Sequence, residues 1–212
     1  MFVYQQSQDK VSTFNVEMDG KTYKCTGNLL RWKFLMYLYN NKIKNITQKK
    51  DLILNAINHV PHNELLSEIV RLTDLYFFNN MLSKLDLLTD VEFQFAKLPS
   101  GIAGSMRVNM HRIVITVNYP QLKRYQTKFE NSGAQSYSFE RCTSLNCAIA
   151  SNLRHELVHL ITYCCTVMTN NKPLVEIDEN PHHNKFFRKI LFNCFDDNSE
   201  YHTFEEYNYK ST

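Results

Sequence analysis

The stretch "NLRHELVHLITY", residues 152–163, decides how the rest of the chain is interpreted. Residues four apart lie on one face of a helix, so His155 and His159 can bind one ion through their imidazole nitrogens. Glu156 lies one step round the helix, where its carboxylate can take a proton from a water on that ion. HExxH on a helix therefore indicates a zinc peptidase. The plainer alternative is an amphipathic helix that carries two surface histidines.

A catalytic zinc ion needs a third protein ligand and an open fourth position. Two kinds of ligand follow the helix along the chain: the acids Glu176 and Glu179, and the histidines His182 and His183. Zinc accepts both carboxylate and imidazole, so metal chemistry alone leaves the choice open. A histidine at the start of the final predicted helix would be held rigidly and could face back towards the pair.

The bulk composition is that of a globular chain. It has 212 residues, of which 43% are apolar and 21% charged, enough for one core or a core with a small appendage. The first residues lack a signal peptide and no apolar run could span a bilayer, so we expect an intracellular protein that is neither secreted nor membrane-bound. Six cysteines form no CxxC pair, which favours reduced thiols. The net charge of +3 neither requires nor excludes nucleic-acid binding.

Two regions differ in character along the chain. Residues 1–60 contain a predicted hairpin at Asp19-Gly20 and two helical stretches, and are expected to form a small α/β appendage. Residues 61–212 begin with a helical period for which Asn63 is the predicted N-cap. Three alternating runs follow, "VEFQFAKL", "GSMRV" and "RIVITVN", and predict a three-stranded antiparallel meander. With the helix around residues 152–163 and a last helix, the expected class is α+β, helices packed on this sheet.

The second region resembles the SprT-like zinc metallopeptidase domain, most closely the Spartan group, which cleaves proteins crosslinked to DNA. The matching segments come in the order of the family: "LYFFNNML", "FQFAKLPSGIAGSMR", "ITVN", "LRHELVHLITY", "HHNKFFRKI" and "EYHTF". Together they lie within about two-thirds of the chain. The resemblance implies a zincin-like fold and one catalytic Zn2+.

The family's third ligand is a histidine with an aromatic residue four positions later. His182 with Phe186 fits that spacing and keeps the following residues in step with the family helix. His183 with Phe187 fits as well, and Glu179 remains an alternative ligand. The implied site is Glu156 as general base, with His155, His159 and His182 as zinc ligands. Tyr163 and Tyr201 are candidates for shaping it.

The same resemblance raises the question of DNA, which activates members of the Spartan group. Basic residues beside aromatics suit single-stranded nucleic acid, through phosphate contacts and base stacking. Tyr119 and Tyr125 stand beside one such cluster. The candidate DNA contacts are Lys123, Arg124, Lys128, Lys185, Arg188 and Lys189.

The sequence thus predicts a zinc-dependent endopeptidase that cleaves DNA-bound or DNA-crosslinked proteins, acting in DNA repair in the nucleus. The DNA partner would be single-stranded or damaged. One alternative is a zinc peptidase with a specific protein substrate and no dependence on DNA. Another is a zinc-stabilised binding module without turnover, although a purely structural site has no need of Glu156.

Overall fold

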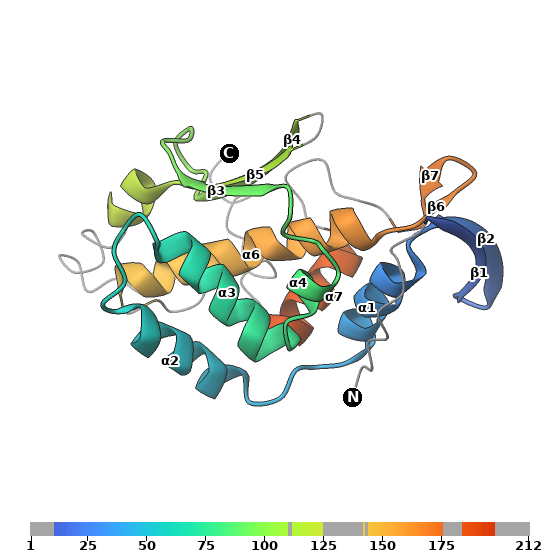
Figure 1. The fold of residues 1–212 in the computed structure, drawn as a ribbon, viewed down its shortest axis with the longest axis horizontal. Helices are drawn as coiled ribbons and strands as arrows, with labels where there is room; N and C mark the ends of the chain where they lie inside the picture. Colours follow the sequence, from blue (N-terminus) through green and yellow to red (C-terminus); the bar gives the residue numbers. More distant parts are fainter. Residues whose placement is uncertain (1–10, 110–111, 125–141, 143, 176–183, 198–212) are drawn as a thin grey trace, which may run out of the picture.

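The computed structural model describes residues 11–109, 112–124, 142, 144–175 and 184–197. Helices form the body of the molecule, a three-stranded sheet covers one side of them, and a second sheet projects as an arm at one end (Figure 1). The α+β class is therefore confirmed, whereas the zincin-like assignment stays a prediction. None of the described helices is long and apolar enough to cross a membrane.

The elements follow one another in an irregular order of helices and strands. The helices are α1 Leu29–Asn40, α2 Ile46–Ile57, α3 Leu65–Phe78, α4 Met81–Lys84, α6 Leu145–Cys165 and α7 Lys185–Phe195. The strands are β1 Ser12–Met18, β2 Lys21–Gly27, β3 Val91–Phe95, β4 Gly104–Asn109, β5 Arg112–Val117, β6 Met168–Thr169 and β7 Lys172–Pro173. A further short helical segment occupies residues 119–124.

Helix α6 is the central element of the fold. It contacts α1, α2, α3 and α7 and passes beneath β4 and β5 (Figure 1). Its Ser144 N-cap accepts a hydrogen bond from the backbone N–H of Cys147, as expected for a serine before a helix. The predicted apolar side, exemplified by Leu153 and Leu157, is fully buried. The predicted polar side is largely buried too, so α6 is enclosed on nearly all sides.

The three-stranded sheet differs from the predicted antiparallel meander. Its order is β3-β5-β4, with β3 parallel to β5 and only β4 antiparallel. Strand β5 is the richest in β-branched residues, and such strands suit a central position that is buried by neighbours. Ile115 and Val117 of β5 are fully buried. The chain therefore crosses over between β3 and β4, and β4 becomes an edge strand.

The predicted helix beginning at Asn63 is also different in detail. Its N-cap is Glu64, without a side-chain cap bond, and the helix stops at Phe78. Asn79 and Asn80 both have positive φ, a conformation that asparagine tolerates better than most residues. The buried Asp74 carboxylate then accepts hydrogen bonds from the backbone N–H groups of the next turn, α4. One predicted helix is thus two helices joined by a capped break.

The N-terminal hairpin at Asp19-Gly20 is confirmed. Strands β1 and β2 are antiparallel, and both turn residues have positive φ, as a two-residue hairpin requires. Thr26 of β2 pairs with Met168 of β6, which joins the hairpin to the segment after α6. Helices α1 and α2 bury apolar side chains in the same core as α3, α6 and α7. All six cysteines carry free thiols, as expected.

Candidate metal centre

The histidine pair lies in the middle of α6. His155 is 4% exposed and His159 is half-buried. Their ring centroids are 5.1 Å apart. Two imidazoles that bind one zinc ion at about 2.0–2.1 Å with a tetrahedral angle would have their ring centroids roughly 5 Å apart. The spacing of the two rings therefore fits a shared metal ion.

Glu156 lies against the edge strand β4. It is 4% exposed, and a Cβ built on Gly104 would come within 2.8 Å of its Oε1 atom. The same Cβ would be 2.4 Å from Oδ1 of Asn152, one helical turn earlier on α6. Real Cβ atoms do not approach other atoms so closely, so only glycine fits here without a shift of the neighbouring groups. The carboxylate therefore lies close against the backbone of the edge strand.

The loop before Gly104 is fixed by the end of β5. Asn118, which is 1% exposed, donates from Nδ2 to the carbonyl of Ile102 at 2.7 Å and of Leu98 at 3.3 Å. Its backbone N–H bonds to the carbonyl of Ala103 at 2.8 Å. These bonds satisfy buried polar groups and set where β4 begins. The hydrogen bonds of Asn118 therefore help to fix the position of Gly104 against α6.

Helix α7 supplies an aromatic wall to the histidine pair. The Phe187 ring centroid is 4.3 Å from that of His159 and 5.2 Å from that of His155. Phe186 points elsewhere, stacked on Tyr39 of α1 at 4.4 Å. Asn184 caps α7 through a hydrogen bond from the N–H of Phe187 at 2.8 Å. The side chain predicted to accompany the third ligand is thus not the one that faces the pair.

The candidate third ligands all lie outside the described residues: Glu176, Glu179, His182 and His183. Tyr201 lies outside them as well. Within the described part of the chain, no three His, Cys, Asp or Glu side chains come together as a metal site. The described donors are therefore the pair on α6, with Glu156 beside it. Their chemistry suits zinc, which is bound by neutral imidazole nitrogens. Tyr163, one turn past His159, is 40% exposed.

On another side of α6, the buried guanidinium of Arg154 interacts electrostatically with the ammonium group of Lys50 on α2. Arg154 is 2% exposed and its guanidinium lies over the ring of Phe195, 5.8 Å from the centroid. Burial lowers the pKa of Arg154. Burial, and then the charge of Arg154, lower the pKa of Lys50 on α2 to about 8, against the opposing effect of Asp197. None of the residues in this cluster is a proposed metal ligand.

The predicted DNA contacts fall into two groups. Lys123 and Arg124 are exposed on the segment 119–124, which begins with Tyr119. Arg188 and Lys189 lie on α7, where Lys189 covers the ring of Tyr39 at 4.0 Å. Lys185 belongs to the first turn of α7, and Lys128 lies outside the described residues. Among the described candidates, Lys123 and Arg124 thus lie on a different element, in another part of the fold, from Arg188 and Lys189 (Figure 1).

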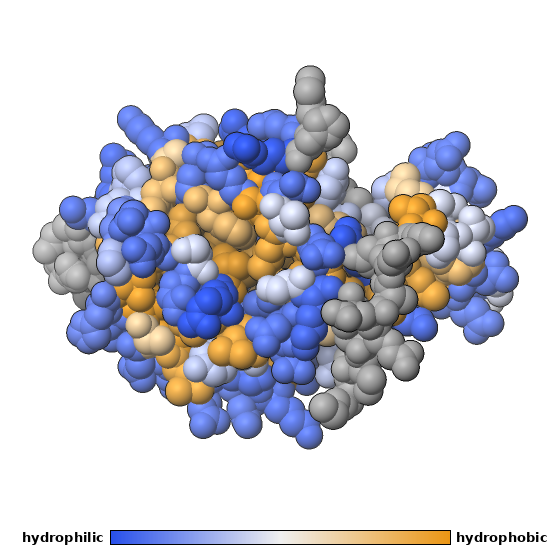
Figure 2. Space-filling model, in the orientation of Figure 1, coloured by the Kyte–Doolittle hydropathy of each residue, from blue (hydrophilic) through white to orange (hydrophobic). Residues whose placement is uncertain are grey.

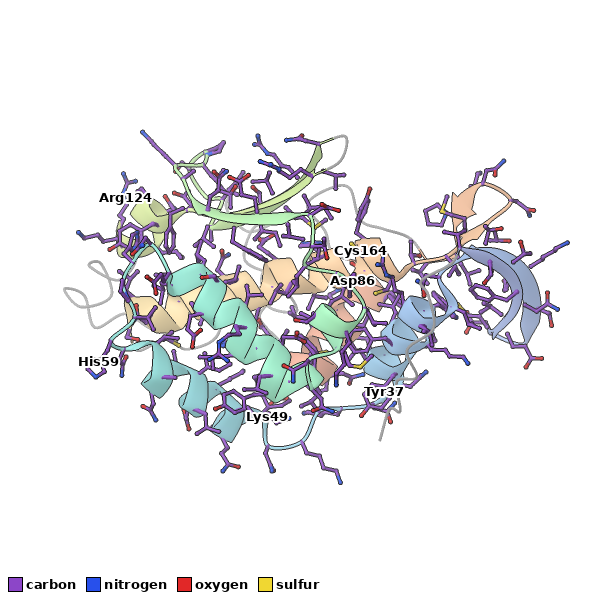
Figure 3. The ribbon with its side chains drawn as sticks, in the orientation of Figure 1. Tyr37, Lys49, His59, Asp86, Arg124 and Cys164 are labelled. Carbon is purple, nitrogen blue, oxygen red and sulfur yellow. The ribbon has the colours of Figure 1, made fainter. Side chains whose placement is uncertain are left out.

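The first group stands beside an aromatic cluster of which the sequence indicated only Tyr119. His62 stacks on Phe95 with centroids 4.3 Å apart, and Tyr119 meets both rings edge-on. His62 is exposed and the other two are partly buried. Figure 3 shows Arg124 and His59 at this same end of the molecule, where Figure 2 shows hydrophilic residues interspersed with apolar ones.

No protein-family model, curated protein or solved structure was found to match the chain. The likeness to the SprT-like domain thus rests on the sequence segments alone. Sequence reasoning missed two residues at the site, Gly104 and Asn152. The signal for the first was a glycine at the start of an alternating run in a chain with only five glycines. The signal for the second was its position four residues before Glu156, on the same helix face.

Proposed function

We propose that this protein is a zinc-dependent endopeptidase that acts on proteins bound or crosslinked to DNA. A zinc ion held here would lower the pKa of its bound water and polarise the peptide carbonyl. His155, His159 and His182 are the proposed ligands. Glu156 takes a proton from the attacking water and delivers it to the leaving amine.

The observation that carries the proposal is the joint placement of the pair and the base. The imidazoles of His155 and His159 are spaced for one ion, while the Glu156 carboxylate lies so close to β4 that a Cβ at position 104 would come within 2.8 Å of its Oε1 atom. A helix with two incidental histidines has no reason to bury a carboxylate beside a bare strand edge, because burial of a charge is costly.

Strand β4 also supplies a place for substrate. As an edge strand it can pair with an extended peptide through main-chain hydrogen bonds, which bind with little regard to side chains. Such binding suits an enzyme that meets many different crosslinked proteins. A substrate paired with β4 would pass close to Glu156, because β4 begins at Gly104 and Gly104 lies against that carboxylate.

The test of the peptidase is the variant Glu156→Gln. We expect it to keep its fold and one zinc per chain but to lose cleavage of an unfolded protein by at least about a hundredfold, because a general base typically contributes 10²–10⁴-fold. The exposed Glu17 on β1 provides the control Glu17→Gln, which removes the same charge far from α6. Zinc content and the cleavage rate are measured together. Full activity in Glu156→Gln would refute the mechanism, and zinc without turnover in the parent would favour the binding module.

The test of the DNA partner uses the aromatic and basic end of the molecule. Lys123 and Arg124 together changed to alanine should weaken binding of a single-stranded oligonucleotide and reduce its salt dependence, because each removes a phosphate contact. The double change Lys21→Ala and Lys24→Ala, at two exposed positions of β2, is the matched control. Fluorescence anisotropy at several salt concentrations measures both. Cleavage that is unaffected by DNA would favour the peptidase with a specific protein substrate.

A further inference from the structure

Asn152 is a buried polar residue that the mechanism above does not use. It lies on α6 one turn before Glu156 and is 2% exposed. Its Oδ1 atom has no hydrogen-bond partner among the described residues. An unsatisfied buried acceptor costs about 1–3 kcal/mol, so its presence beside a candidate site calls for an explanation.

The carboxamide of Asn152 and the carboxylate of Glu156 occupy the same small space under β4. The Cβ position of Gly104 lies 2.4 Å from Oδ1 and 2.9 Å from Nδ2 of Asn152, and 2.8 Å from Oε1 of Glu156. Amide and acid side chains four apart on a helix form a stabilising hydrogen-bonded pair. The two groups are therefore neighbours along the helix and meet at the same point of the sheet.

Their chemistry is complementary in only one orientation of the amide. A buried carboxylate needs hydrogen-bond donors, and an amide oxygen facing it would repel it. A half-turn of the carboxamide exchanges its oxygen and nitrogen with little change of shape. It would direct the N–H2 group, rather than the oxygen without a partner, into the space that the two groups share.

We propose that Asn152 is a positioning residue for Glu156. Its carboxamide donates a hydrogen bond to the carboxylate and keeps it turned towards β4, where the water and the substrate meet. The inference rests on the proposed function, because Glu156 must be the general base for its orientation to matter. Orientation matters strongly, since a misplacement of about 1 Å can cost roughly a hundredfold in rate.

The first experiment needs no metal and no activity. Nitrogen-15 spectra of the metal-free protein report the side-chain N–H2 group of Asn152, identified by its loss in Asn152→Asp. A hydrogen bond to a carboxylate shifts one of these protons downfield, so we expect that shift to disappear in Glu156→Ala. It should remain in Ser151→Ala, which removes a buried hydroxyl, also 2% exposed, from the preceding position on α6. An Asn152 resonance that Glu156→Ala leaves unchanged would overturn the proposal.

The second experiment measures turnover. Asn152→Leu has a similar volume and cannot donate, and Asn152→Ala covers the case in which leucine prevents folding. We expect kcat to fall at least about tenfold while KM and zinc content stay within about twofold. Ser151→Ala should match the parent. An unchanged kcat in both Asn152 variants would sink the inference. If the parent neither binds zinc nor cleaves, the proposed function fails, and the resonance alone then decides the role of Asn152.

Discussion

At the scale of single residues, Gly104 is the position of β4 that lies closest to the candidate base. Its backbone passes so close to α6 that a methyl group would press on both Asn152 and Glu156. Glycine is needed here for close approach, whereas Gly20 and Gly101 have the positive φ that glycine tolerates best. The geometry of the base therefore depends on a residue that has no side chain.

Gly104→Ala should separate turnover from folding. We expect kcat to fall at least about tenfold, because the added methyl displaces the carboxylate, while zinc content is retained. Gly27→Ala is the matched control, since its methyl would meet Val167 at 2.9 Å, far from the histidine pair. That variant should lose stability but keep its kcat per folded molecule. Equal losses of kcat in the two variants would show that the effect at residue 104 is only structural.

Lys50 should make the stability of the protein depend on alkaline pH. Its pKa of about 8 lies below the value near 10.4 of an unfolded chain. At pH 7 lysine is charged in both states, so the full cost of burying the charge is present. As the pH rises from about 8 to about 10.4, the folded protein has already released the proton that the unfolded chain still holds, and stability increases.

Lys50→Met should therefore be more stable than the parent at pH 7, by about 1–2 kcal/mol, and this advantage should shrink towards pH 10. Thermal unfolding of both proteins across this range measures the difference. Lys44→Met, at an exposed site, is the control for losing a positive charge. A constant difference across the range would mean that Lys50 is not responsible.

At the scale of elements, the sequence predicted helices and strands better than their connections. The helix of residues 152–163 and the hairpin at Asp19-Gly20 followed from periodicity and turn chemistry, and both are confirmed. The parallel pairing of β3 with β5 could not be read in the same way. Alternating runs look alike in parallel and antiparallel ladders, and the strand order depends on a crossover that no local pattern encodes.

The sequence predicted the proximity of those candidate site residues that lie on a single helix. His155, Glu156 and His159 share a turn of α6, so their proximity follows from helix geometry alone. Gly104 reaches them through the packing of a distant strand, and Phe187 through the packing of another helix. Contacts of this kind depend on how elements pack, which spacing along the chain does not specify.

The capped start of α7 bears on the choice between two adjacent histidines. Phe187 faces the pair, and a continuous helix would place His183, four residues earlier, on the same face. Asn184 has an extended backbone, with ψ of 170°, so the helical phase does not continue back through it. The orientation of Phe187 therefore gives no reason to replace His182 as the proposed ligand.

We expect His182→Ala to bind less than about a tenth of the zinc of the parent, because two imidazoles alone hold the ion weakly. His183→Ala should bind nearly as much as the parent and serves as the control one residue away. Zinc is measured after dialysis against a fixed free-zinc buffer. The reverse result would assign the third ligand to His183, and loss in neither variant would point to Glu179.

At the scale of the whole molecule, α1 and α7, the first and last described helices, are joined by hydrogen bonds. Asn193 of α7 donates from Nδ2 to the carbonyls of Leu38 and Tyr39, at 3.1 and 2.7 Å, and accepts from the N–H of Ile43 at 2.8 Å. The end of α1 is thus capped by a residue more than 150 positions away. Lys42 and Asp196 form an exposed ion pair nearby at 2.6 Å.

Asn193→Ala should lower the stability of the whole fold by about 1–3 kcal/mol, because two buried carbonyls lose their donor. In a chain of this length that is a fall in Tm of roughly 2–10 °C. The control is Asn40→Ala, whose exposed amide bonds only within α1, to the carbonyl of Met36 at 2.9 Å. Calorimetry or circular dichroism measures both. A Tm unchanged by Asn193→Ala would show that α1 needs no cap from α7.

The pairing of Thr26 with Met168 and the cap supplied by Asn193 both join residues that are synthesised far apart in time. Residues 26 and 38–39 leave the exit tunnel well before their partners Met168 and Asn193, so β2 and α1 keep apolar faces uncovered until those partners have been synthesised. At about 5–20 residues per second this exposure lasts on the order of ten seconds or more. Nascent chains of this protein should consequently be clients of chaperones that hold apolar segments during translation.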